Sequence, residues 1–396
     1  MIVKFTFVYR QLFLFLFILI FKSNTNAQVT LPSGFSDKLV ANGFNQIQGF
    51  VQDSIGRYYT WERGGRVIIL DTNLTKLPTL IDIKEEVGSW GDHGLNAIAL
   101  DPAFESNGYI YLFYTVDRHH LMNFGTANYN ANTNQYYEAT IARLTRYTCD
   151  EATNYTSIIP NSRLVLIGSN VTNGIPVLAS NHSGGGLAFG SDGSLLVATG
   201  DAAVNGGDTG SFVGTYWQQA IADSILKPTN NVGAYRSQIV QSLNGKILRI
   251  NPANGNGYQS NPFYNPNRPQ SAISLVYALG FRNPFRISVK KGTGSTDVTA
   301  GDPGIIYIGD VGATKYEELN VCDASGQNFG WPLYEGFSTT TEFYGKNHTN
   351  LYAANPLYGQ GCNQPYFTYM ELLKQPIITG LPIFKNTCDT NISIPA

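Results

Sequence analysis

A short unit that recurs along the chain constrains its fold most. The unit has a turn with Asp, Ser or Asn before Gly, then a short strand, then a polar or glycine-rich exit. Its copies read QDSIGRYYTWERGG, FESNGYIYLFYT, GSDGSLLVATGDAA and GDPGIIYIGDVGA. Degenerate repeats of this kind, rich in Tyr, Ile, Val and Phe, favour the blades of a β-propeller. A β-sandwich is the alternative.

The same pattern predicts individual strands and an all-β class. With 41 Gly, 18 Pro and 24 Tyr and few stretches of helical periodicity, the chain is typical of short strands between turns. Two long polar segments, Arg118 to Glu138 and Gly206 to Gln241, are expected to be functional or partner-facing loops. Residues 337–396 show no clear strand, which leaves a last blade in doubt. The expected strands lie within Gly56 to Leu70, Gly108 to Val116, Gly193 to Asp201, Gly245 to Asn251 and Gly304 to Gly312.

The N-terminus predicts export. Residues 1–27 contain Lys4 and Arg10, the apolar run Leu12 to Phe21 and a polar stretch ending in Ala27, which is the pattern of a cleaved signal peptide. An uncleaved anchor is the alternative, and it would be the chain's one contact with a membrane. Residues 28–396 are then a secreted or periplasmic domain.

Charge and cysteine content narrow the classes of function. A net charge of −2 without a long basic run excludes a nucleic-acid footprint, because phosphate binding needs clustered Lys and Arg. Four cysteines without CxxC spacing argue against a zinc or redox site. They are expected to form structural disulfides, with three connectivities open, or to be buried thiols.

Five motifs, in order, carry a family resemblance. The chain resembles the soluble glucose/sorbosone (aldose sugar) dehydrogenases, which are quinoproteins that use pyrroloquinoline quinone (PQQ) and calcium on a six-bladed β-propeller. The resemblance covers most of residues 56–336, and it implies that the last blade is incomplete or that the chain is truncated. The motifs are GDHGLNAIALDPAFESNGYIYLFYT, NHSGGGLAFGSDGSLLVATGD, NGKILRINP, ALGFRNPFRISV and IGDVGATKYEELNVCDASGQNFGWPLYEG.

The resemblance assigns the catalytic pair to His182 and Asp201. His182 is implied as the base that takes the hydroxyl proton while hydride leaves the same carbon, a task that suits an imidazole. Asp201 falls where the family's carboxylate orients that base. The structural alternative is a histidine that caps a turn, with Asp201 forming an Asx turn after its strand.

Cofactor-binding residues follow from the same resemblance. Arg282 and Asn283 match the pair that polarises the quinone oxygens, although an ion pair and a turn would also explain them. Gly312 and Ala313 occupy the positions whose carbonyls hold calcium. Val311, which has no side-chain oxygen, stands where the family has glutamine. Asp92 stands at another glutamine position and is a weaker candidate contact to the cofactor.

These assignments predict a substrate class and leave alternatives. The expected function is oxidation of a hydroxyl of an aldose or related alcohol by hydride transfer to PQQ, with an external electron acceptor. The family's cations of the last blade, which bind the PQQ carboxylates, have no match after Gly336. A non-catalytic propeller that binds a glycan or a protein is therefore the main alternative. A hydrolase or lyase that uses Asp92 and His93 is a third.

Overall fold

The computed structural model describes residues 31–204, 214–344, 346, 348–373, 383–386, 388, 389, 391 and 393–395. The predicted signal peptide lies outside these residues. The chain divides into two compact units, Met1–Asn42 and Gly43–Ala396, and everything below concerns the second. In the described part of the chain, no helix is long and apolar enough to cross a bilayer.

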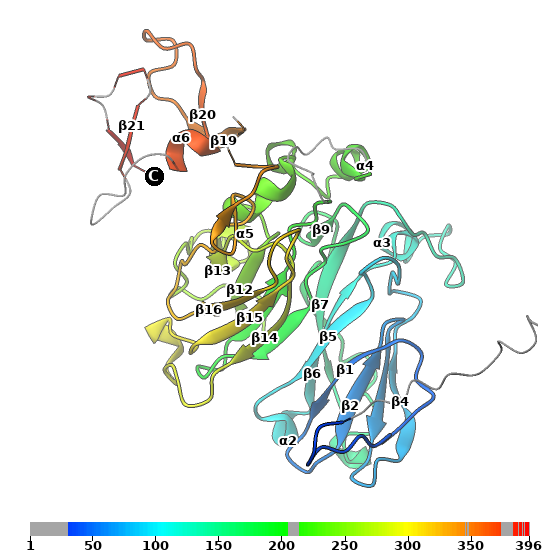
Figure 1. Ribbon diagram of the computed structural model, residues 1–396. Coiled ribbons are helices and arrows are strands. Elements are labelled where there is room, and N and C mark those ends of the chain that lie inside the picture. The colour runs from blue at the N-terminus through cyan, green and yellow to red at the C-terminus, as the bar shows by residue number, and fades with distance from the viewer. Residues whose placement is uncertain are drawn as a thin grey trace, which may run out of the picture. The chain divides into compact units, whose positions relative to one another are not determined.

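Four antiparallel sheets with at least three strands follow one another in chain order among the described residues (Figure 1). Each is built mainly from sequence neighbours, as expected where Gly-containing turns separate short β-branched and aromatic runs. The first sheet contains β1 (Ile47–Gln52), β2 (Tyr58–Glu62), β3 (Arg66–Leu70) and β4 (Lys76–Asp82). The second contains β5 (Leu95–Leu100), β6 (Tyr109–Thr115), β7 (Thr140–Thr148) and β8 (Leu164–Ile167), with β9 (Ile175–Val177) paired to β7. The third contains β10 (Gly186–Phe189), β11 (Leu195–Thr199), β12 (Lys246–Ile250) and β13 (Val276–Leu279), and the fourth β14 (Pro284–Val289), β15 (Ile306–Asp310) and β16 (Glu318–Cys322).

The all-β class and the predicted strands are confirmed. The predicted number of six blades was wrong, because the described residues form four propeller-like sheets. After β16 the chain makes two-stranded pairs, which bury too little surface to act as blades. The segment that follows β16 instead returns to β13, where the Leu279 N–H donates to the Gln327 carbonyl at 3.0 Å. The pairs are β17 (Tyr334–Glu335) with β18 (Ser338–Thr339), β19 (Thr349–Ala354) with β20 (Tyr366–Thr368), and β21 (Ile383–Lys385) with β22 (Ser393–Pro395).

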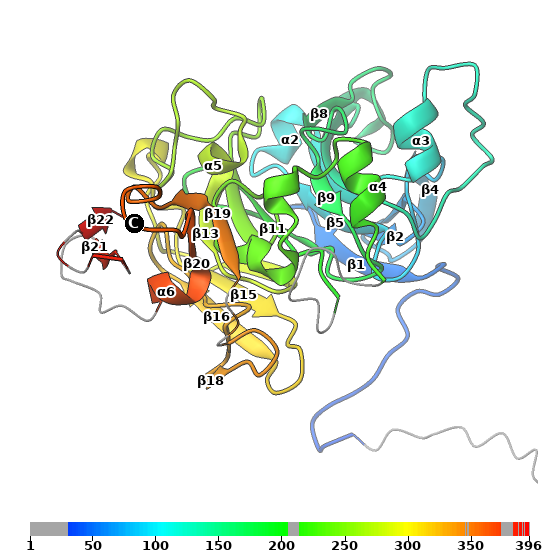
Figure 2. The same ribbon diagram turned by 90° about the horizontal axis from the view of Figure 1, so that it is seen from above.

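Short helices occupy the connections (Figure 2). The two long polar segments contain α3 and α4, which lie side by side in both views, so these segments are partly ordered helix rather than plain loop. Residues 205–213 of the second segment lie outside the described residues. The helices are α2 (Phe104–Asn107), α3 (Arg118–Asn123), α4 (Trp217–Ala222), α5 (Ala272–Leu275) and α6 (Tyr369–Leu373), and the 3₁₀ turns are η1 (Glu151–Thr153), η2 (Pro228–Asn230), η3 (Gly233–Gln238) and η4 (Val298–Ala300).

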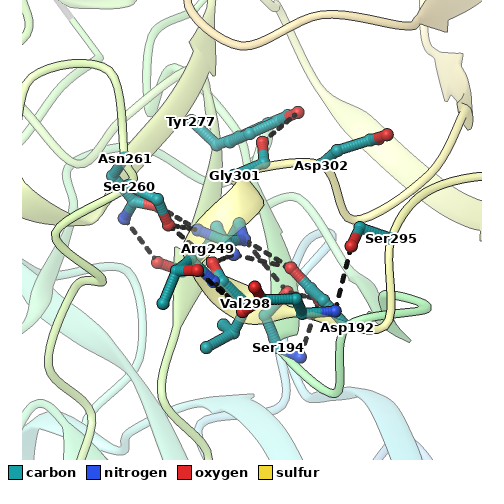
Figure 3. A network of polar contacts seen from close by, with 12 residues as sticks. Asp192, Ser194, Arg249, Ser260, Asn261, Tyr277, Ser295, Val298, Gly301 and Asp302 are labelled. Carbon is teal, nitrogen blue, oxygen red and sulfur yellow. Dashed lines mark hydrogen bonds and ion pairs between the residues drawn. The ribbon is translucent and has the colours of Figure 1, made fainter.

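The third sheet is the most deeply buried, since every residue of β11 and β12 is buried. Two of these residues are charged, Lys246 and Arg249 of β12, and both are 0% exposed. Figure 3 shows the contacts of Arg249. Its guanidinium donates to the Asp192 carboxylate at 2.6 Å, to Asn261 Oδ1 at 2.8 Å and to the Val298 carbonyl at 2.8 Å. Further bonds to the hydroxyls of Ser194 and Ser260 engage its remaining donors. A buried charge is tolerated when it is paired and fully hydrogen-bonded, so this network holds the third sheet to η4.

The cysteines are divided between the two expected roles. Cys362 and Cys388 form a disulfide with their Cα atoms 5.7 Å apart, and Cys149 and Cys322 are buried free thiols. Burial raises the pKa of both free thiols to about 12. They are therefore structural, inert thiols.

Candidate active site

His182 and Asp201 meet at one end of the third sheet. His182 precedes β10 and Asp201 follows β11, and because these strands are antiparallel, the start of one lies beside the end of the other. His182 Nδ1 lies 2.8 Å from Asp201 Oδ1, and the two side chains are 4% and 0% exposed. A carboxylate oxygen accepts, so Nδ1 carries the proton, and in the neutral tautomer the lone pair lies on Nε2.

The backbone around His182 is adapted to this geometry. His182 itself has a φ of 57°, in the left-handed region that few residues other than glycine adopt. A Cβ at Gly200 would overlap the carbonyl oxygen of His182. Backbone strain of this kind collects at functional sites, where the surrounding structure holds it in place.

Trp331 completes the environment of Asp201, although no sequence pattern distinguished it. Its indole Nε1–H donates to Asp201 Oδ2 at 2.8 Å, while the Ala203 N–H donates to Oδ1 at 2.8 Å. Burial alone would raise the pKa of Asp201, but the charge and hydrogen bond of His182 and the Ala203 N–H lower it. Asp201 is therefore an anion that accepts hydrogen bonds from three donors.

Arg282 and Asn283 reach the same place from the start of β14. Asp310 at the end of β15 accepts the N–H of Arg282 at 3.0 Å and that of Asn283 at 2.6 Å. Asn283 Oδ1 then accepts the Gly184 N–H at 2.9 Å, which ties the pair to the His182 loop. Burial raises the pKa of Asp310 to about 7, although these two N–H groups oppose the shift.

The Arg282 guanidinium is positioned by two contacts. Nη1 donates to the Val311 carbonyl at 2.9 Å, and the Cζ atom lies 5.5 Å from the centroid of the Trp331 ring. Val311, which lacks the family's side-chain oxygen, thus contributes its backbone. A positive charge held beside the His182 and Asp201 pair is suited to stabilising developing negative charge.

Asp92 lies next to His182 but contacts its backbone. Asp92 Oδ2 accepts the His182 N–H at 3.3 Å. His93, in contrast, is 0% exposed, with Nε2 2.7 Å from the Ala179 carbonyl, and burial lowers its pKa to about 4. A fully buried neutral histidine gives no support to the hydrolase or lyase alternative.

The loop of Gly312 and Ala313 is organised by carboxylates that the sequence analysis did not single out for this role. The Gly312 N–H donates to Glu317 Oε2 at 3.1 Å, and the Ala313 N–H donates to Glu335 Oε1 at 2.6 Å. Glu335 also accepts the next three N–H groups of the loop. Within the described ranges, no group of three or more His, Cys, Asp or Glu side chains could hold a metal ion.

Two buried cations lie beneath the pair, and sequence reasoning missed both. Arg236 of η3 donates from Nε to the Asp201 carbonyl at 3.0 Å and from Nη2 to the Ala202 carbonyl at 2.8 Å. The Lys246 ammonium donates to the carbonyls of Arg236, Ser237 and Asn244 at 2.6–2.9 Å. Burial lowers the pKa of Arg236 to about 10 and that of Lys246 well below its usual value. These side chains bond to backbone and fix the floor of the site.

The chain is similar to known proteins over most of its length. Residues 49–370 match the family described as glucose/sorbosone dehydrogenase. The HIPL2 protein of Arabidopsis thaliana is 28% identical over 273 residues, which are 65% of this chain and 35% of that protein, so the match spans about a third of the relative's length.

Solved structures of sugar dehydrogenases are also similar. A glucose dehydrogenase structure is 18% identical, with a TM-score of 0.50, over 77% of this chain and 70% of that one, and this likeness supports the propeller fold. The PQQ-bound aldose sugar dehydrogenase of Streptomyces coelicolor is 23% identical, with a TM-score of 0.49, over 78% and 68%. Since the family match includes the loops that carry His182, Asp201, Arg282 and Asn283, the chain belongs to the glucose/sorbosone dehydrogenase family.

Proposed function

We propose that this chain is an exported sugar dehydrogenase that oxidises a hydroxyl of an aldose or related alcohol by hydride transfer to PQQ. The observation that carries the proposal is the buried pair of His182 and Asp201, with Nδ1 2.8 Å from the carboxylate. Family membership supports an oxidoreductase that acts on sugars. Electrons would then pass to an external acceptor.

In this proposal the protein moves the proton. His182 Nε2 accepts the hydroxyl proton as the C–H hydride leaves, and Asp201 stabilises the imidazolium that forms. Bound PQQ would supply the two-electron acceptor. Arg282 and the Asn283 amide would face its quinone oxygens and favour the negative charge that develops there.

The residues present fit such a group. The Arg282 guanidinium, held beside the Trp331 ring, would give the quinone oxygens a fixed positive charge. The N–H groups of the Gly312 loop are engaged by Glu317 and Glu335, so the loop would offer calcium its carbonyl oxygens. Oxygen donors are what a hard cation takes.

The test is to supply the full chain with PQQ and calcium, then follow dye reduction over a panel of aldoses and alcohols, together with the shift in melting temperature. We expect oxidation of at least one sugar and a rise in melting temperature when PQQ is bound. His182→Gln should lower kcat by about 10²–10⁴-fold, because the base is lost. His119→Gln, on the α3 segment, is the matched control and should leave kcat unchanged.

Two results would contradict the proposal. No dye reduction together with no shift in melting temperature would favour a non-catalytic propeller that binds a glycan or a protein. Full activity of His182→Gln would remove the assignment of the base while leaving the family intact.

A further inference from the structure

An aromatic cluster lies beside the His182 loop, and the proposed reaction does not use it. Its centre is the indole of Trp90, which is 3% exposed. The ring centroids of Tyr137 and Tyr216 lie 5.0 and 5.9 Å from the Trp90 ring. The Tyr137 ring is tilted by 49° to the indole and stays 61% exposed, so much of its surface faces solvent.

A single tight turn connects this cluster to the catalytic base. The turn runs from Trp90 to His93 and is closed by the His93 N–H, which donates to the Trp90 carbonyl at 2.8 Å. At one end of the turn the indole packs on the tyrosines. Near its other end, Asp92 Oδ2 accepts the His182 N–H at 3.3 Å.

The segment that leads to His182 supports both ends. The carbonyl of Leu178 accepts the Tyr216 N–H at 2.8 Å, and the carbonyl of Ser180 accepts the Asp92 N–H at 2.9 Å. Leu178 and His182 are four positions apart, and an extended chain of that length spans at most about 14 Å. Trp90 is also only two positions from Asp92, which contacts the His182 N–H, so the aromatic cluster is a close neighbour of the base.

The backbone at Tyr137 is anchored through the next residue, Glu138. The φ of Tyr137, 59°, is in the left-handed region, which is unusual for a bulky residue. Glu138 lies 3.0 Å from Arg118 Nε and accepts from Gln219 of α4 at 2.6 Å. Arg118 also donates to Asp223 at 2.7 Å, which fixes α4 against α3. These contacts tie the backbone beside Tyr137 to α3 and α4.

We propose that Tyr137, supported by Trp90 and flanked by Tyr216, is a binding subsite for a second sugar ring. The substrates are then oligosaccharides whose terminal hydroxyl is oxidised at His182, an inference that rests on the proposed function. The C–H face of a pyranose is its apolar surface, and a tyrosine ring covers it at low conformational cost. The neutral aromatic character of the cluster suits an uncharged sugar.

The test compares kcat/KM for glucose with kcat/KM for maltose, cellobiose and their trisaccharides, using the full chain with PQQ and calcium. We expect kcat/KM to rise from monosaccharide to oligosaccharide. Tyr137→Asn should lower the ratio of oligosaccharide to monosaccharide kcat/KM by about tenfold. Asparagine tolerates the left-handed backbone, so the ring is removed without new strain. Tyr137→Phe should retain the ratio.

Phe124→Ala is the matched control, because Phe124 is on the same segment and is also 61% exposed, but packs on His120. It should leave the ratio unchanged. A second readout is the calorimetric binding of the trisaccharides to the chain without cofactor, which Tyr137→Asn should weaken by a similar factor. Melting temperatures of all variants show that they are folded.

The outcomes separate the two proposals. Oxidation of sugars with a ratio that Tyr137→Asn does not change would overturn the subsite and leave the proposed function standing. No oxidation, but trisaccharide binding that depends on Tyr137, would overturn the proposed function and support the subsite. If the chain neither oxidises sugars nor binds the trisaccharides, the subsite is overturned as well.

Discussion

Replacing Asp201 by asparagine tests the arrangement of donors around this carboxylate. Asp201 accepts from His182 Nδ1 and the Ala203 N–H through Oδ1, and from Trp331 Nε1 through Oδ2, all at 2.8 Å. An asparagine accepts through one oxygen only. Because two donors address Oδ1, the amide oxygen should turn to that side, and its NH₂ group then opposes the Trp331 N–H.

The magnitude follows from counting unsatisfied groups. Asp201→Asn leaves two buried donors without acceptors, the new NH₂ group and the Trp331 N–H, at about 1–3 kcal/mol each. Trp331→Phe leaves one carboxylate oxygen without its donor. The two single variants together leave three unsatisfied groups and the double variant leaves one, so its free energy of unfolding should fall by about 2–6 kcal/mol less than the sum of the single effects.

Urea denaturation of the wild type, the two single variants and the double variant measures this coupling. In the same samples, kcat of Asp201→Asn should fall, because the imidazolium loses its anionic partner. Single-variant effects that add to within about 0.5 kcal/mol would refute the arrangement, since groups that do not share a contact are additive.

Further predictions concern stability, pH and thiol reactivity. Arg249→Met should lower the free energy of unfolding by about 3–5 kcal/mol, because it leaves a buried carboxylate unpaired, whereas Lys84→Met, which removes an exposed pair at 3.6 Å, should change it little in the same urea experiment. Burial raises the pKa of Asp310 from 3.8 to about 7, so its contribution to stability is complete below pH 3.8 and is lost as the pH rises through 7, by about 4 kcal/mol. The difference in unfolding free energy between wild type and Asp310→Asn, measured by urea denaturation from pH 4 to pH 8, should show this slope, and a constant difference would contradict it. Thiol titration should find Cys149 and Cys322 unreactive in the native chain and reactive after unfolding, and rapid native labelling would show that they are accessible.

Local sequence predicted the strands well because turn chemistry and β-propensity act over a few residues. Each expected strand, for example Gly193 to Asp201, is present as β11 or its counterpart. The number of blades could not be obtained in this way. It depends on long-range pairing, such as that of Gln327 and Asn328 with Leu279 of β13, which joins residues about fifty positions apart.

The candidate site shows the same division. His182, Asp201, Arg282 and Asn283 were selected from motifs in the expected order, and the fold brings their loops together. Trp331, by contrast, lies in the stretch NFGWPLYEG of the fifth motif, and no pattern there pairs its indole N–H with Asp201. A tryptophan at that position is equally typical of a residue of the hydrophobic core.

The sequence alone determined the strand-and-turn units, the all-β class and the chemical types at the site, because these follow from short-range propensity and from motifs. The tertiary structure decided the number of sheets, the three donors on Asp201 and the position of Tyr137 over Trp90. These depend on contacts between residues that are distant in sequence, such as Asp201 and Trp331, 130 positions apart. Such contacts form when the buried polar groups of separate sheets must find partners, and no local pattern encodes that requirement.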